Sequence, residues 1–173
     1  RVLGSAVTSG EIGSYGDFRI AGLPHTTVRL KVTAPTYLTS WAPGRRFAAE
    51  ADLYTVDPQL YFGESTDVGV VAIYRPGTIA GQVLSSMDPV GSVKVTVFNA
   101  DTGAAIRSVT TDAEGRYRVE NLWTGPSVRV KVRASKDGYL TNWADSYTQQ
   151  TMATATIFEL GPGEVLEQTW SGT

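Results

Sequence analysis

Short stretches of alternating apolar and polar residues recur through the second half of the chain. Val93, Val95 and Val97 alternate with Lys94 and Thr96, and the same period of two runs through residues 128–134. A period of two is that of a strand with one buried face. With the Gly, Pro and Asp turns between them, such stretches predict strands at residues 78–84, 92–99, 106–111, 116–120, 128–134, 154–160 and 164–170.

Frequent turns between these short strands predict an antiparallel β-sandwich rather than β–α–β units. Residues 112–115 predict a hairpin loop, because Asp112 can open the turn and Gly115 can adopt positive φ. Residues 161–163 predict a turn that joins the last two strands as a closing pair. The expected core consists of Val83, Val93, Val95, Val97, Tyr117, Val119, Leu122, Val128, Val130 and Val132.

Two parts of the chain resemble each other. Residues 28–34 read VRLKVTA and residues 128–134 read VRVKVRA, while residues 37–42 read YLTSWA and residues 139–144 read YLTNWA. Similarity kept in order over this length indicates a repeat. We therefore expect all-β architecture with two tandem transthyretin- or Ig-like sandwiches, at residues 1–77 and 78–173.

The first module has no counterpart for the first two strands of the second. A sandwich without two strands exposes unpaired backbone edges. Two explanations stay open: the chain is one part of a longer or processed protein, or another segment donates the missing strands to the first module.

Composition narrows the class of protein. The chain has 173 residues, 42% of them apolar, and it is rich in β-branched residues, which argues against a coiled coil and against a disordered tail. The absence of Cys excludes zinc ribbons, thiol catalysis and disulfides. The net charge of −2 predicts no binding to nucleic acid, and no apolar run is long enough to span a membrane.

Several short motifs of the second module carry a resemblance to a known family. They are Gly81-Gln82-Val83, residues 93–97, residues 111–117, Leu122 and Gly138-Tyr139. In these motifs the module resembles a carboxypeptidase regulatory-like domain, a transthyretin-like sandwich related to B-type surface-protein repeats. The tail through residues 143–163 is similar to tandem repeats of secreted, often actinobacterial, proteins. The first module departs from the pattern at residues 12–15, where the hairpin loop differs.

The residues offer little for catalysis. The single histidine, His25, has no Gly-x-Ser-x-Gly motif to act with, and no His-Glu-x-x-His motif is present. Asp112 and Glu114 share one tight loop, which orders a hairpin more often than it cleaves a glycosidic bond. The predicted terminal strands lack the Lys and Asn of an internal isopeptide bond. We expect no enzymatic activity, no cofactor and no metal.

Repeated aromatic pairs supply the candidate ligand-binding residues, which are Tyr37, Trp41, Tyr139 and Trp143. Flat rings with a polar tip can stack against sugars. They can equally close the end of a sandwich, which is the interpretation the position beside core strands favours. Basic side chains alternate with the core valines, including Arg129, Lys131 and Arg133, and they should form a solvated outer face. The alternative interpretation is that they form a patch that binds anionic polymers or a neighbouring module.

These observations predict a non-catalytic accessory segment of a secreted or cell-surface bacterial protein. Its role would be to space, stabilise or dock adjacent domains of a longer chain, or to accept a donated strand. The alternative is a carbohydrate-binding module that stacks polysaccharide on Trp41 and Trp143, and part of a hydrolase is a less supported third reading.

Overall fold

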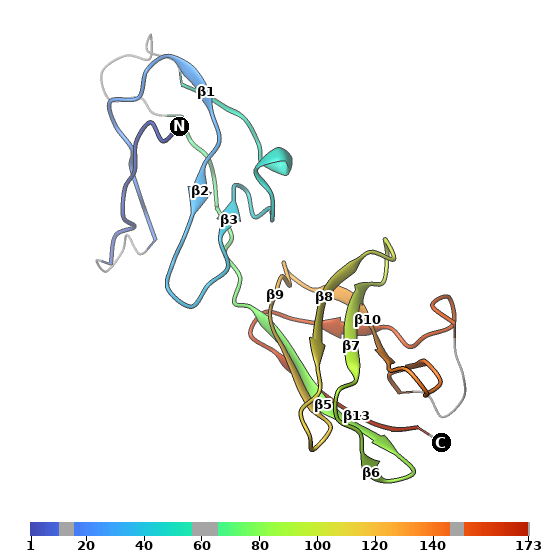
Figure 1. The fold of residues 1–173 in the computed structure, drawn as a ribbon. Helices are drawn as coiled ribbons and strands as arrows, with labels where there is room; N and C mark the ends of the chain where they lie inside the picture. The colour runs from blue at the N-terminus through green and yellow to red at the C-terminus, as the bar shows by residue number, and fades with distance from the viewer. Residues whose placement is uncertain (11–15, 57–65, 146–150, 173) are drawn as a thin grey trace.

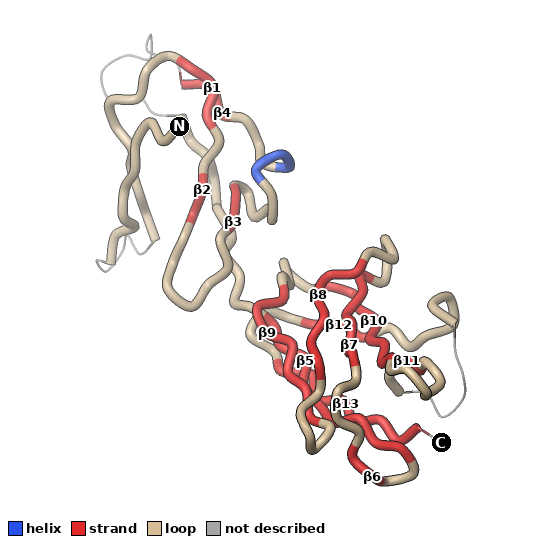
Figure 2. Tube along the Cα trace, viewed as in Figure 1, coloured by secondary structure: helices blue, strands red, loops and turns tan. Residues whose placement is uncertain are grey.

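The computed structural model describes residues 1–10, 16–56, 66–145 and 151–172 (Figure 1). Two parts are visible, an N-terminal region of residues 1–76 and a C-terminal sandwich of residues 77–172, joined through the segment that follows residue 66. Strands fill most of the sandwich, whereas irregular chain dominates the N-terminal region (Figure 2). The all-β expectation is therefore confirmed. The described residues include no helix long and apolar enough to cross a membrane.

The C-terminal sandwich consists of two sheets packed on each other. In the first sheet β8, β7, β10 and β11 are adjacent in that order, and β12 also pairs with β10; in the second, β5 lies between β9 and β13 and forms a short hairpin with β6. The strands are β5 (Gly77–Ser85), β6 (Asp88–Pro89), β7 (Lys94–Asn99), β8 (Ala105–Thr110), β9 (Arg116–Leu122), β10 (Val128–Ser135), β11 (Asn142–Trp143), β12 (Phe158–Leu160) and β13 (Val165–Gly172).

One hydrophobic core lies between these sheets. Every predicted core residue belongs to it, although Val128 at the start of β10 is only partly buried and packs against its margin. The sequence pattern missed Ile79 and Leu160, both fully buried. Both lie near strand ends or in stretches without clean alternation, where a period of two gives no signal.

The predicted closing pair is wrong. Strand β12 pairs with β10 in one sheet, whereas β13 runs parallel to β5 in the other, with Leu166 opposite Ile79. The segment before β12, residues 154–157, forms no strand. A period of two identifies a strand but not its partner, so an apparent hairpin turn at residues 161–163 can lead from one sheet to the other.

The N-terminal region contains only short elements: β1 (Thr26–Val28), β2 (Lys31–Val32), β3 (Ser40–Trp41), the 3-10 turn η1 (Ala48–Glu50) and β4 (Tyr54–Val56). Strand β1 pairs with β4, and β2 pairs with β3. Among its described residues, the buried ones are Ser40, Ala42 and Ala51, all small. The predicted departure at residues 12–15 lies outside the described residues.

The two parts share a strand–loop–strand arrangement. The amide of Ala42 donates to the carbonyl of Leu30 at 3.0 Å, and the amide of Ala144 donates to that of Val132 at 2.9 Å. The pairing of β2 with β3 likewise corresponds to that of β10 with β11. These contacts equate residues 26–32 with residues 128–134, two positions away from the match that the sequence indicates. A slip of two keeps the same side chains on the same face, so the sequence pattern alone cannot detect it.

Candidate functional site

Trp143 lies on the outer face of the first sheet, where it forms part of a second, smaller apolar cluster. It is 5% exposed, and its ring lies 5.4 Å from that of Phe98 on β7. Met152 and Ala155 pack against the same cluster. The Trp143 ring is therefore covered, as expected of an aromatic residue that packs against the sandwich. It has no exposed face on which a sugar could stack.

The other three candidate aromatic residues are more accessible. Tyr139 is 51% exposed, with the ammonium of Lys136 5.4 Å from its ring centre. Tyr37 and Trp41 in the N-terminal region are half-buried. The structure therefore does not bring Tyr139 and Trp143 onto one exposed surface, because neighbours along the chain differ in burial. A ligand-binding role for these residues stays a prediction.

The basic side chains of β10 do not all form a solvated face. Arg129 is exposed and pairs with Asp101 at 2.6 Å. Lys131, by contrast, is 6% exposed, and its ammonium donates to the carbonyl of Met152 at 2.6 Å. The guanidinium of Arg133 lies 4.9 Å from the Phe98 ring centre. The expectation of a solvated face is wrong for Lys131, because residues 152–155 cover this part of the sheet.

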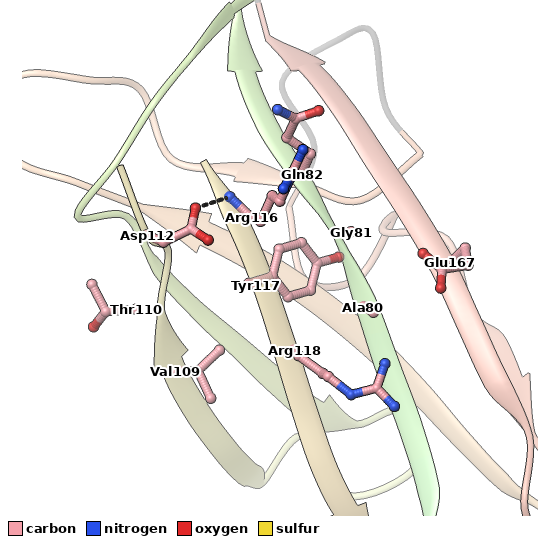
Figure 3. A pocket seen from close by; sticks show the side chains of 10 residues that line it. All are labelled: Ala80, Gly81, Gln82, Val109, Thr110, Asp112, Arg116, Tyr117, Arg118 and Glu167. Atoms are coloured by element: carbon pink, nitrogen blue, oxygen red, sulfur yellow. Dashed lines mark hydrogen bonds between the residues drawn. The ribbon is translucent and has the colours of Figure 1, made fainter. Parts of the chain in front are cut away.

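A groove with a volume of about 610 Å³ lies where β8 and the hairpin loop approach the second sheet (Figure 3). We call it the Tyr117 groove. Its lining residues come from four strands and the hairpin: Ala80, Gly81, Gln82, Val109, Thr110, Asp112, Arg116, Tyr117, Arg118 and Glu167. The surface is hollow there because Ala80 and Gly81 on β5 are small, and long polar side chains on β9 and β13 surround the groove.

The polar groups of the Tyr117 groove are largely engaged in structural roles. The Tyr117 hydroxyl donates to the carbonyl of Gln168 at 3.1 Å, and burial raises the Tyr117 pKa, with a further increase from the Glu167 carboxylate. Tyr117 therefore stays protonated and acts as a donor rather than as a base. The Asp112 carboxylate accepts the backbone N–H of Arg116 at 2.7 Å, which orders the hairpin as the sequence predicts.

The charges around the groove are of both signs. Arg118 pairs with Glu120 at 2.6 Å, and both side chains are about half exposed. No group of three or more His, Cys, Asp or Glu side chains that could hold a metal occurs among the described residues. Sequence reasoning missed this groove, since its walls come from strands that only the sheet order places together.

The sequence predicts no catalytic site at His25. His25 is exposed in the loop before β1. Trp123 contacts Tyr74 edge-on, with 5.8 Å between the ring centres.

The family model of the carboxypeptidase regulatory-like domain matches residues 78–160, from β5 to the end of β12. This is the family that the motifs of the second module resemble, and the match covers just under half of the chain. No curated protein matches the chain.

Proposed function

Because residues 78–160 belong to the carboxypeptidase regulatory-like domain family, which is non-catalytic, we propose that the chain is an accessory β-sandwich segment. In this proposal it forms part of a secreted or cell-surface bacterial protein, where it spaces, stabilises or docks an adjacent domain. The tandem arrangement of modules at residues 1–77 and 78–173 belongs to the same proposal. A domain of this kind acts through its shape and surface rather than through reactive side chains.

The self-contained core of the C-terminal sandwich is the observation that carries the proposal. Ile79, Val119 and Val132 are 0% exposed, and they come from both sheets. A closed core resists deformation because each buried side chain is held by close-packed neighbours. Such a body can keep a neighbouring domain at a fixed distance.

The connection between the two parts supports a spacing role. Tyr74 contacts Trp123 edge-on, and its carbonyl accepts the amide of Leu38 at 2.8 Å. The Thr124 hydroxyl donates to the carbonyl of Arg75 at 3.2 Å. The connecting residues thus contact both parts, which favours a semi-rigid link over a free tether.

Distance measurement between two spin labels tests the spacing role. The chain has no native Cys, so Thr27→Cys and Ala105→Cys introduce the only labelling sites, both at exposed positions. We expect a narrow distance distribution that broadens in Trp123→Ala, which removes the contact with Tyr74. Tyr139→Ala, an exposed aromatic residue away from the connection, is the matched control. A distribution in the parent chain as broad as that of a Gly/Ser linker would contradict the spacer.

Carbohydrate binding is the second candidate, favoured by the exposed ring of Tyr139 beside Lys136. A retention assay on polysaccharides tests it. We expect Tyr139→Ala to abolish retention if this ring stacks on a sugar, whereas Trp143→Phe should leave retention unchanged because Trp143 is covered. An absence of retention on every polysaccharide would remove this candidate.

A further inference from the structure

Part of the outer face of the first sheet lies beyond the cover of residues 152–155. Six polar side chains form this part, in two rows across β10, β7 and β8 that the strand pairing places side by side: Arg133, Thr96 and Ser108 in one row, and Ser135, Lys94 and Thr110 in the next. They point away from the core, because the residues that alternate with them on β7, Val95 and Val97, are buried in it. We call these six residues the hydroxyl face.

Most of the hydroxyl face is accessible. The exposed side chains are those of Lys94, Ser108 and Thr110. Arg133 and Ser135 are half-buried. Thr96 is 3% exposed, and its hydroxyl lies 3.0 Å from that of Ser108. Hydroxyl groups, each able to donate and to accept hydrogen bonds, therefore lie beside two cations.

Neither row of the hydroxyl face contains an acidic side chain. Acidic residues follow each strand of this sheet region, but in the connections beyond the strand ends: Asp101, Asp112, Asp137 and Asp145. The two ion pairs found among the described residues both lie elsewhere. Lys94 and Arg133 are diagonal neighbours on adjacent strands, a spacing of roughly 7–8 Å, so their charges repel each other unless an anion lies between them.

Two buried groups beside the hydroxyl face are also left without an anion. Lys131 is 6% exposed, and its ammonium donates to the carbonyl of Met152 rather than to a carboxylate. The Nε of Arg133 is buried and has no hydrogen-bond partner in the structure. The Arg133 guanidinium lies over the rings of Phe98 and Trp143, which hold it in one orientation. The positive charge of this region is therefore fixed in place and not neutralised by the described side chains.

We propose that the hydroxyl face binds an acidic polysaccharide, a polymer whose carboxylates are interspersed with hydroxyl groups. A carboxylate between Lys94 and Arg133 accepts charge-assisted hydrogen bonds from both side chains. The Ser and Thr hydroxyls of the two rows bond to the hydroxyls of the sugars. The inference goes beyond the spacing role, and it requires no stacking on the exposed ring of Tyr139.

Two features favour a polysaccharide over a polypeptide or a dense polyanion. Strand β7 pairs with β10 on one edge and with β8 on the other, so the face offers side chains but no free backbone of β7 to an added peptide strand. Nucleic acids and polyphosphate are held by several cations along their length, whereas this face has two accessible cations and the chain has a net charge of −2.

Isothermal titration calorimetry on the full chain tests the proposal. The probe is sodium hyaluronate, whose carboxylates lie on alternate sugars, and its methyl ester, which lacks the charges, is the matched polymer. We expect binding to hyaluronate and none to the ester. The affinity for hyaluronate should fall between about 50 and about 500 mM NaCl, because salt screens exposed charges.

Substitution of single cations locates the site. Lys94→Gln should weaken binding at least about fivefold, because a charge-assisted hydrogen bond is lost, and the exposed position leaves the fold intact. Arg133→Gln should weaken it by a similar factor, with circular dichroism as the check on folding. Arg116→Gln is the matched control, since Arg116 is an exposed cation on β9 of the other sheet and should leave the affinity unchanged.

Several results would overturn the proposal. They include no binding to hyaluronate at low salt, and equal weakening by Lys94→Gln and Arg116→Gln, which would show an effect of net charge alone. Tighter binding of poly-L-glutamate or of inorganic polyphosphate than of hyaluronate would make an acidic polypeptide or a dense polyanion the occupant. Loss of binding in Tyr139→Ala but not in Lys94→Gln would assign the polysaccharide to the exposed ring. The spin-label distances do not depend on these results, so failure of the spacer and failure of this site are distinguishable.

Discussion

At the scale of single residues, the sandwich depends on a close approach between two backbones at Gly81. A Cβ atom at Gly81 would lie 1.5 Å from the carbonyl oxygen of Gln168 on β13. The approach lets β13 lie parallel to β5, and it places the Gln168 carbonyl where the Tyr117 hydroxyl donates to it. One glycine therefore determines both the last strand pairing and the floor of the Tyr117 groove.

We expect Gly81→Ala to lower the free energy of unfolding by about 3 kcal/mol or more, because the methyl group forces the β5 and β13 backbones apart. Chemical denaturation measures this loss. Gly161→Ala is the control, since its Cβ would meet only the flexible end of Glu164 at 3.3 Å. Equal free energies of unfolding for the two variants would show that β13 does not approach Gly81 this closely.

Tyr117 makes stability depend on alkaline pH. Burial raises its folded-state pKa above the ordinary value of 10.0, so the unfolded chain releases this proton first. The stabilisation of the folded state by protonated Tyr117 is therefore complete below pH 10, and it is lost as the pH rises toward the folded-state pKa. We expect Tyr117→Phe to cost about 0.5–1.5 kcal/mol at neutral pH and to lose stability less steeply above pH 10. A denaturation series across pH 8–11 that gives parallel curves would contradict this role.

At the scale of elements, β10 is buried on both faces for different reasons. Its valines face the core between the sheets, while Lys131 and Arg133 face Phe98, Trp143 and the carbonyl of Met152. The Arg133 guanidinium lies over the Phe98 and Trp143 rings, and the Lys131 ammonium is bonded to a backbone carbonyl. Residues 152–155 therefore act as a third layer over part of the sheet.

This layer predicts a difference between the two repeated tryptophans. Trp143→Ala should lower the free energy of unfolding by about 3–5 kcal/mol, as expected for a buried aromatic side chain. Trp41→Ala should cost less than half of that, because Trp41 is only half-buried. Denaturation followed by a probe in each part measures the two losses. Equal losses would mean that Trp41 is as well packed as Trp143.

At the scale of the whole molecule, the two parts differ in how much of their apolar surface is covered. The core clusters lie entirely in the C-terminal sandwich among the described residues. Large apolar side chains of the N-terminal region stay exposed, including Val7 at 92%, Leu53 at 59% and Val70 at 89%. The sandwich should therefore be the stable unit of the chain, and the N-terminal region the part that opens first.

Limited proteolysis checks this order. We expect early cleavage within residues 1–76 and a persistent fragment that starts close to Gly77 and retains the sandwich, identified by intact mass. The reason is that local opening, which exposes the backbone to the protease, requires less free energy where few apolar contacts are lost. Early cleavage within β7 or β10 would contradict the assignment of the stable unit.

The sequence by itself determined the strands with clean alternation, nearly all the core valines, the hairpin at residues 112–115 and the family of residues 78–160, because these depend on local pattern and turn chemistry. The tertiary structure decided what local pattern cannot encode. It placed β13 beside β5, formed the Tyr117 groove and buried Lys131 under residues 152–155. It also showed which residues of the two parts correspond, two positions away from the match that the sequence indicates. It also distinguished Trp143 from Trp41, since two similar sequences differ in burial through Phe98, Met152 and Ala155, neighbours from other parts of the chain.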